Sequence, residues 1–327
     1  MKREEKAFVG EFNELLESFV KQKIVLGYKY DATRDSLKRF SHYTLNYRID
    51  KKSLSKELVL SWTARRKNES DITWAHRSSD LRQFALYLQS HGYDAFIPPK
   101  CHKIRRHAFV PYIFTQEEIQ NFMRVVDSIA PHPRSNKNQS YPLLFRLLYC
   151  CGLRITESLQ IKISDVDSDK GTLLIREAKF GKDRILPLSP SLASMFVRYH
   201  GLFNKNKSAD DYYFTNKGGT PVTRDRVYKV YRQLLWKVGI SHGGKGKGPR
   251  LHDLRHTFCV HTLAKQVKAG VDLYVALPIL SVYLGHCSVR ATQGYVRLTA
   301  EAYPDLIEEI SRTCAHVLPE VTINETH

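Results

Sequence analysis

The stretch HDLRHT, residues 252–257, says more about the fold of this chain than any other segment. Its basic side chains His252 and Arg255 stand three positions apart, and on an α-helix this spacing places them on one face. Both side chains can then act on a single phosphate group. A His-x-x-Arg pair also arises by chance, with a capping or packing role, so its meaning depends on the segments around it.

Three further short motifs, or boxes, accompany this stretch, one before it and two after it in the chain. GLRITE occupies residues 152–157, LGH occupies residues 284–286, and Tyr295 follows nine positions after His286. Each box is weak by itself, but the four in this order and spacing resemble the tyrosine recombinases, the phage integrase family. The resemblance is specific over roughly residues 112 to 300. Before that it is only architectural, because the N-terminal region is similar to the helical core-DNA-binding domain of the family.

The resemblance implies a mainly α (α+β) fold. We expect a helical N-terminal core-DNA-binding bundle, followed by a mixed, mostly helical catalytic domain with a small antiparallel β-sheet. The resemblance also implies that the phenol of Tyr295 attacks phosphorus, forms a 3′-phosphotyrosyl link and frees a 5′-hydroxyl. The catalytic set that it carries over to this sequence is Arg154, Lys179, His252, Arg255, His286 and Tyr295.

The residue types of this set suit the chemistry of a phosphodiester. Arg154 and Arg255 present rigid forks of donors that hold phosphate oxygens and neutralise the charge that builds on them. A phenol has a pKa of about 10, so the proton of Tyr295 needs an acceptor at neutral pH. By the motif, His252 accepts that proton or donates a hydrogen bond to the phosphate. His286 is expected to hydrogen-bond the phosphate or to orient its neighbours.

A basic turn between two apolar segments supplies the remaining groups. Residues 173–175 and 185–188 flank KFGK at residues 179–182, a pattern that predicts a β-hairpin with a basic tip. Lys179 is expected to protonate the leaving 5′-oxygen as a general acid, with Lys182 as its open rival. Glu157 is expected to brace Arg255 or His252 as a supporting group rather than to transfer protons.

Charge points to nucleic acid as the partner. The 327 residues include 51 Lys and Arg against 33 Asp and Glu, and the formal net charge of +18 favours polyphosphate through counterion release. The alternative on composition alone is a basic protein without such a partner. No segment has the length of a membrane span and no apolar signal core follows Met1, so a cytoplasmic protein is expected.

The six cysteines predict reduced thiols, because their spacing forms no disulfide framework. A zinc site is disfavoured, since the chain has no Cys-x-x-Cys pair. The residues considered for it are His256, Cys259, His261, His286 and Cys287.

Apolar periodicity and proline positions predict the domain organisation. Helical spacing recurs through the first hundred residues, and Pro98-Pro99 then opens a basic extended stretch. We expect a core-DNA-binding domain at residues 1–98, a basic interdomain linker at 99–111, a catalytic domain at 112–315 and a polar tail at 316–327. Thr115 and Glu118 form a predicted capping box at the start of the catalytic domain. Candidate DNA contacts are Lys100, Lys103, Arg105, Arg106, Lys182, Lys245 and Lys247.

The prediction from sequence is a site-specific DNA recombinase that integrates or excises a mobile element. Its expected partner is duplex DNA with specific recombination sites, on which four copies of the chain assemble, with room for accessory DNA-binding factors and no role for a membrane. A short amphipathic helix from Pro304 to Ile310 is expected to dock on a neighbouring copy. No cofactor, metal or ATP is expected. A type IB topoisomerase and a catalytically silent DNA-binding regulator are the alternatives.

Overall fold

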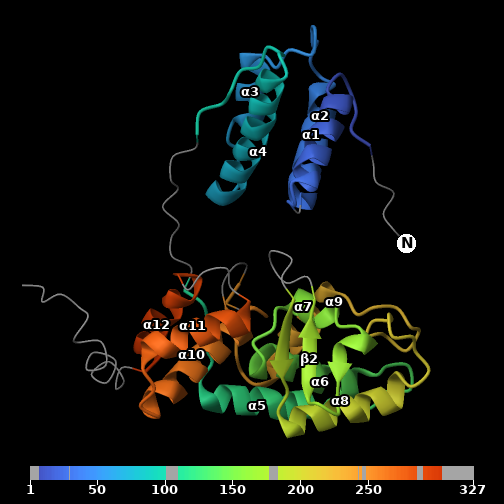
Figure 1. Ribbon diagram of the computed structural model, residues 1–327, viewed down its shortest axis with the longest axis vertical. Helices are drawn as coiled ribbons and strands as arrows, with labels where there is room; N and C mark the ends of the chain where they lie inside the picture. The colour runs from blue at the N-terminus through green and yellow to red at the C-terminus, as the bar shows by residue number, and fades with distance from the viewer. Residues whose placement is uncertain are drawn as a thin grey trace, which may run out of the picture. The chain divides into compact units, whose positions relative to one another are not determined.

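The computed structural model describes two compact units. Contacts divide the chain into Met1–Phe109 and Val110–His327. The described residues are 7–28, 30–100, 110–176, 183–241, 243–244, 248–285 and 290–303. Figure 1 labels helices and strands of both units. The domain boundaries expected from the sequence stay a prediction.

The N-terminal unit is helical, as the apolar periodicity predicts. Its described helices are α1 (Asn13–Val25), α2 (Asp31–Thr44), α3 (Lys56–Thr63) and α4 (Asp71–Ser90). Ser55 and Ser70 accept hydrogen bonds from the backbone at the starts of α3 and α4, which explains where these helices begin. Phenylalanine side chains fill the core between the helices, and Phe12 meets Phe84 edge to face with ring centroids 5.9 Å apart.

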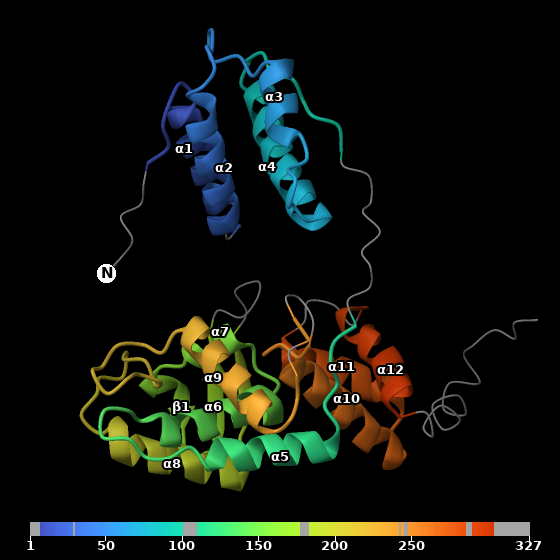
Figure 2. The ribbon, with the colours of Figure 1, turned by 180° about the vertical axis from the view of Figure 1, so that it is seen from behind.

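The C-terminal unit combines helices with a small sheet (Figures 1 and 2). Its first half contains α5 (Gln116–Asp127), α6 (Lys137–Cys150), α7 (Ile155–Leu159), a 3₁₀ turn (Ile163–Asp165), β1 (Val166–Asp167), β2 (Thr172–Ile175) and β3 (Arg184–Pro187). Its second half contains α8 (Pro190–Phe203), α9 (Arg224–Lys237), α10 (Asp253–Lys268), α11 (Leu273–Leu284) and α12 (Arg290–Ala302). The mainly helical fold with a small antiparallel sheet is confirmed.

Local signals of the sequence set the boundaries of several elements in this unit. Thr115 and Glu118 form the predicted capping box at the start of α5, with side chain and backbone bonded reciprocally. The sheet has the order β1-β2-β3, and β2 pairs antiparallel with β3 so that Ile175 stands opposite Arg184. The predicted hairpin is therefore confirmed in its strands. Its tip, residues 177–182, lies outside the described residues.

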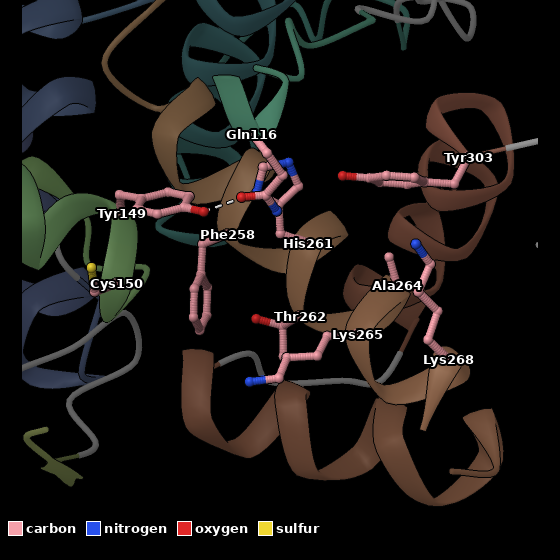
Figure 3. Close-up of a pocket in the computed structure, with 10 residues that line it drawn as sticks. All are labelled: Gln116, Tyr149, Cys150, Phe258, His261, Thr262, Ala264, Lys265, Lys268 and Tyr303. Atoms are coloured by element: carbon pink, nitrogen blue, oxygen red, sulfur yellow. Dashed lines mark hydrogen bonds between the residues drawn. The ribbon is translucent and has the colours of Figure 1, made fainter. Parts of the chain in front are cut away.

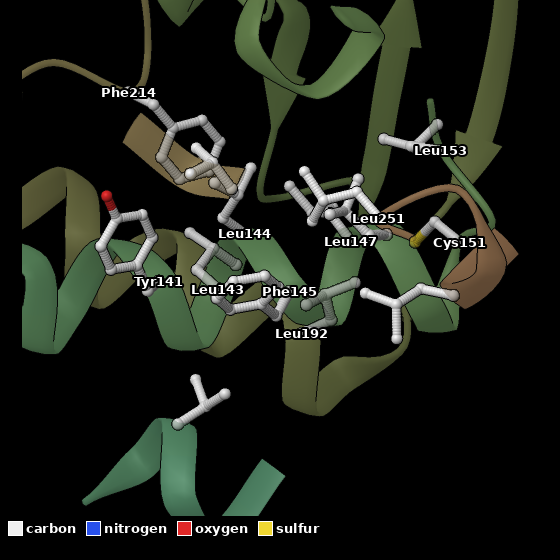
Figure 4. Packing of buried hydrophobic residues seen from close by; sticks show 14 of the residues in the cluster. Tyr141, Leu143, Leu144, Phe145, Leu147, Cys151, Leu153, Leu192, Phe214 and Leu251 are labelled. Atoms are coloured by element: carbon white, nitrogen blue, oxygen red, sulfur yellow. The ribbon is translucent and has the colours of Figure 1, made fainter. Parts of the chain in front are cut away.

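Helix α6 runs through the main core of the C-terminal unit. Its buried side chains Tyr141, Leu144, Phe145 and Leu147 point to different sides and contact several neighbouring elements. Tyr149, near the end of this helix, hydrogen-bonds His261 of α10, with 2.9 Å between the hydroxyl and Nδ1 (Figure 3). Figure 4 shows the packing of leucines and aromatic rings around α6. Because most of its side chains between Ser140 and Leu148 are buried, α6 fixes the segment that follows it, which carries Arg154.

Helices α10, α11 and α12 form a second, smaller core at one end of this unit (Figures 1 and 2). The apolar run before Leu284 forms α11, with Asp272 as its cap and Pro278 inside it. Gly285 ends this helix in the left-handed region. Within the described part of the chain, no helix has the length and apolar character that crossing a membrane requires.

Candidate active site

Arg154 lies in the bend between α6 and α7, where the sequence predicts it. It is the residue before the first helical turn of α7, and its backbone N–H donates to Glu157 Oε2 at 3.0 Å. The guanidinium, about one fifth exposed, donates to Glu157 Oε1 at 2.6 Å. Gly152 makes the bend possible, because it has a φ of +58° and a Cβ there would lie 2.5 Å from the ring of Phe258.

Glu157 is the buried carboxylate that links the basic groups of this region. Arg184, the first residue of β3, donates to both of its oxygens, at 2.9 and 3.3 Å, and its Nε donates to the Tyr283 carbonyl. Burial raises the pKa of the Glu157 carboxyl, but the hydrogen bonds and charges of Arg184 and Arg154 outweigh it and hold that pKa below its usual range. Glu157 therefore stays ionised between two guanidinium groups.

Arg255 brings three of the sequence boxes together. The guanidinium is fully buried and donates to the carbonyls of Gly152, at 2.6 Å, and of Leu284, at 2.9 Å. A third group, Glu157 Oε2, lies 3.9 Å from its Nη1. Burial lowers the pKa of Arg255, and the positive charge of Arg154 lowers it further. The two arginines are thus neighbours that share one counter-ion.

Two histidines stand at the start of α10. His252 is the exposed residue that precedes the first turn, and its ring centroid is 4.7 Å from that of His256 in an edge-to-face contact. His256 is half-buried beside Arg255. Burial lowers the pKa of His256 to about 3, with further lowering by His252 and Arg255. His256 is therefore neutral at physiological pH.

Tyr295 projects from α12 onto this face of α10. The residue is 6 % exposed, and its hydroxyl oxygen lies 3.1 Å from Nδ1 of His256. Burial raises the pKa of the Tyr295 phenol above its ordinary value, and Cys259 raises it further, whereas the charge of Arg255 and a hydrogen bond from it lower it. The resting phenol is protonated, in contact with one guanidinium of the arginine pair.

Four of the six predicted catalytic residues meet in this region, namely Arg154, His252, Arg255 and Tyr295. Lys179 and His286 lie outside the described residues. Of the candidate DNA contacts, Lys100 is described and exposed. Those that lie outside the described residues are Lys103, Arg105, Arg106, Lys182, Lys245 and Lys247.

Two residues of this region were not assigned a role from the sequence. Arg184 has a local signal, since it is a charged residue at the start of the strand RILP, where its side chain is about nine-tenths buried. His256 follows Arg255 directly and was considered only as part of a disfavoured zinc site. No local sequence signal indicates the contact between His256 and Tyr295, because Tyr295 belongs to a helix more than thirty residues later in the chain.

A cavity of about 430 Å³ opens on a different face of α10 (Figure 3). It is lined by the Tyr149 and His261 pair, by Lys265 and Lys268, and by Tyr303 after α12. His261 Nε2 also lies 2.9 Å from the carbonyl of Phe114, so both of its ring nitrogens are engaged. This second tyrosine and histidine pair is separate from the cluster around Tyr295.

Comparison with known proteins agrees with these features. The family model described as the phage integrase family matches residues 113–302, more than half of the chain. A putative integrase/recombinase of Sinorhizobium fredii, y4rB, is 29 % identical over 92 % of this chain and 97 % of its own length. Tyrosine recombinase XerA of Pyrococcus horikoshii is 30 % identical over 61 % of each chain.

Solved structures show the same fold. The integrase of the Tn1549 transposon, in complex with transposon right end DNA, superposes with a TM-score of 0.60 at 17 % identity, over 90 % of this chain and 99 % of that one. The XerH site-specific recombinase, bound to a palindromic difH substrate, gives a TM-score of 0.60 at 20 % identity, over 85 % of this chain and 79 % of that one.

Proposed function

We propose a residue-level mechanism for this chain, which belongs to the phage integrase family and is a tyrosine-type DNA recombinase. The observation that carries the mechanism is the position of the Tyr295 hydroxyl beside Arg255 and His256, with Arg154 joined to Arg255 through Glu157. We assign these groups the roles of nucleophile, phosphate-binding pair and bracing carboxylate.

The arginine pair is proposed to bind the scissile phosphate. Each guanidinium donates to non-bridging oxygens and neutralises the charge that grows on them during attack. Arg154 is the more exposed of the two and is the natural first contact, whereas buried Arg255 is held by two carbonyls and has a fixed orientation. Glu157 keeps both groups in place without entering the reaction.

Strand cleavage then exchanges one phosphoester for another. The Tyr295 oxygen forms a bond to phosphorus, the bond from phosphorus to the 5′-oxygen breaks, and the phenolic proton passes to His252 or to solvent water. By the sequence motif, His252 accepts that proton or donates to the phosphate. Lys179 is proposed to give a proton to the departing 5′-oxygen, with Lys182 as its rival, and His286 to hydrogen-bond the phosphate.

The scheme uses neither a metal nor ATP. The phosphotyrosyl link keeps the free energy of the broken phosphodiester, so a 5′-hydroxyl from another duplex can attack it and restore the DNA. The arginines supply the charge neutralisation that a metal ion gives elsewhere. The net charge of +18 supports duplex DNA as the partner.

Recombination between two sites needs more than one copy of the chain. We propose a tetramer on paired sites, with residues 304–310, which lie outside the described residues, docking on a neighbour. The structural neighbour from Tn1549 is a transposon integrase in complex with transposon right end DNA, which favours the ends of a mobile element as the substrate.

A nicked suicide duplex tests the proposal. Short nicked duplexes are synthesised with the sequences that flank the gene and are incubated with the protein. The products are then resolved by denaturing gel electrophoresis. We expect a covalent protein–DNA adduct that Tyr295→Phe abolishes while duplex binding persists. Salt-sensitive binding with no adduct would instead indicate a regulator. Relaxation of supercoiled DNA by a monomer, without exchange between sites, would indicate a topoisomerase.

A further inference from the structure

The hydroxyl of Tyr295 meets a histidine that the family motif does not assign to it. Helix α10 places His252, Arg255, His256 and Cys259 along one side, and the phenol of α12 packs against this side. The distance from the Tyr295 hydroxyl to His256 Nδ1 is 3.1 Å, and the two ring centroids are 5.6 Å apart. These contacts hold the phenol at its reactive end.

The direction of this hydrogen bond follows from the charges around it. The phenol is protonated and has a single hydrogen to donate. A neutral imidazole offers one nitrogen lone pair, which accepts more strongly than the sulfur of Cys259, which also lies beside the hydroxyl. When Nδ1 accepts, the phenol oxygen keeps its lone pairs for Arg255 and for phosphorus. The opposite direction would turn the phenol hydrogen away from this nitrogen, towards weaker acceptors such as the sulfur of Cys259.

We propose that His256 is the positioning residue of the nucleophile: its Nδ1 accepts the Tyr295 hydroxyl hydrogen and aims the oxygen at the phosphate held by the arginines. This inference rests on the proposed function and adds a residue to it. The imidazole acts as a neutral acceptor, and burial beside Arg255 keeps it in that form. His252, at the exposed start of α10, keeps the two alternative roles that the motif gives it.

Orientation of the oxygen affects the rate of cleavage rather than the binding of DNA. A nucleophile misplaced by about 1 Å can cost on the order of 100-fold in rate, and loss of one buried hydrogen bond has a similar scale. Single-turnover cleavage of the suicide duplex at saturating protein measures this step. We expect His256→Phe, which keeps a planar ring but removes the acceptor, to cleave roughly 10- to 100-fold more slowly than the parent chain.

A matched pair of amide variants tests the geometry without relying on the phenylalanine variant to fold. In His256→Asn the amide oxygen occupies the position of Nδ1, whereas in His256→Gln it stands one bond farther out. The expected order of cleavage rates is parent, then Asn, then Gln, with equal duplex affinity and similar thermal unfolding. A merely structural role would not separate the two amides in this order.

The second tyrosine and histidine pair supplies the control. Tyr149→Phe removes the hydroxyl that bonds His261 on the same helix and should leave the cleavage rate unchanged (Figure 3). The inference is overturned if His256→Gln cleaves as fast as His256→Asn, or if folded His256→Phe cleaves at the parent rate. Either of these results differs from a failure of the proposed function, because in that case the parent chain itself would form no adduct.

Discussion

Replacing Glu157 by glutamine should destabilise the C-terminal unit strongly while hardly changing its shape. The carboxylate is buried and lies 2.6 Å from Arg154, 2.9 Å from Arg184 and 3.9 Å from Arg255. Glutamine keeps the volume but removes the negative charge that these guanidinium groups share. Removing one partner of a buried ion pair costs about 3 to 5 kcal/mol. For a unit of this size, that corresponds to a decrease in melting temperature of roughly 6 to 20 °C.

Thermal unfolding followed by circular dichroism measures this shift, with a surface ion pair of the same unit as the control. Arg146 donates to both oxygens of Asp127 at 2.7 Å, but the carboxylate is about half exposed. Asp127→Asn should therefore cost no more than about 1 kcal/mol. If Glu157→Gln melts no lower than Asp127→Asn, the carboxylate does not act as the shared counter-ion and the reasoning is wrong.

Three further predictions concern activity and pH. Arg154→Ala should abolish cleavage but keep most of the duplex affinity, because one phosphate contact is a small part of so basic a surface. A loss of duplex binding in a filter assay that parallels the loss of cleavage would count against this prediction. Cleavage should survive EDTA, and a loss that zinc or magnesium restores would contradict the metal-free scheme. Below its unfolded pKa of 6.5, His256 gains a proton in the unfolded chain but not in the folded one until about pH 3. The free energy of unfolding by urea should therefore fall from pH 6.5 towards pH 3, and less so in His256→Asn.

Local signals explain why much of the fold could be predicted. The capping box at Thr115, the bend at Gly152 and the paired strands of the hairpin depend on neighbouring residues, and each lies where the sequence places it. The position of Arg154 in the bend can be predicted for the same reason, because it follows Gly152 by two residues. Such features need no knowledge of the tertiary structure.

The partners of the buried groups could not be predicted in this way. Glu157 was expected to brace Arg255 or His252, yet its shortest contacts are to Arg154 and Arg184. Arg184 reaches it from a strand twenty-seven positions away in the chain. The contact of Tyr295 with His256 likewise depends on how α12 packs on α10. Tertiary packing alone decides such pairs.

The two glycines of the sequence boxes have a common physical role at Arg255. Gly152 gives its own carbonyl to this guanidinium, and the carbonyl of Leu284 comes from the residue before Gly285. Both glycines have a positive φ, and a Cβ on Gly285 would lie 2.9 Å from the guanidinium of Arg184. The glycines therefore turn the chain ends of α6 and α11 towards one buried cation. Boxes that lie far apart in the sequence belong together because their carbonyls hold the same arginine in place.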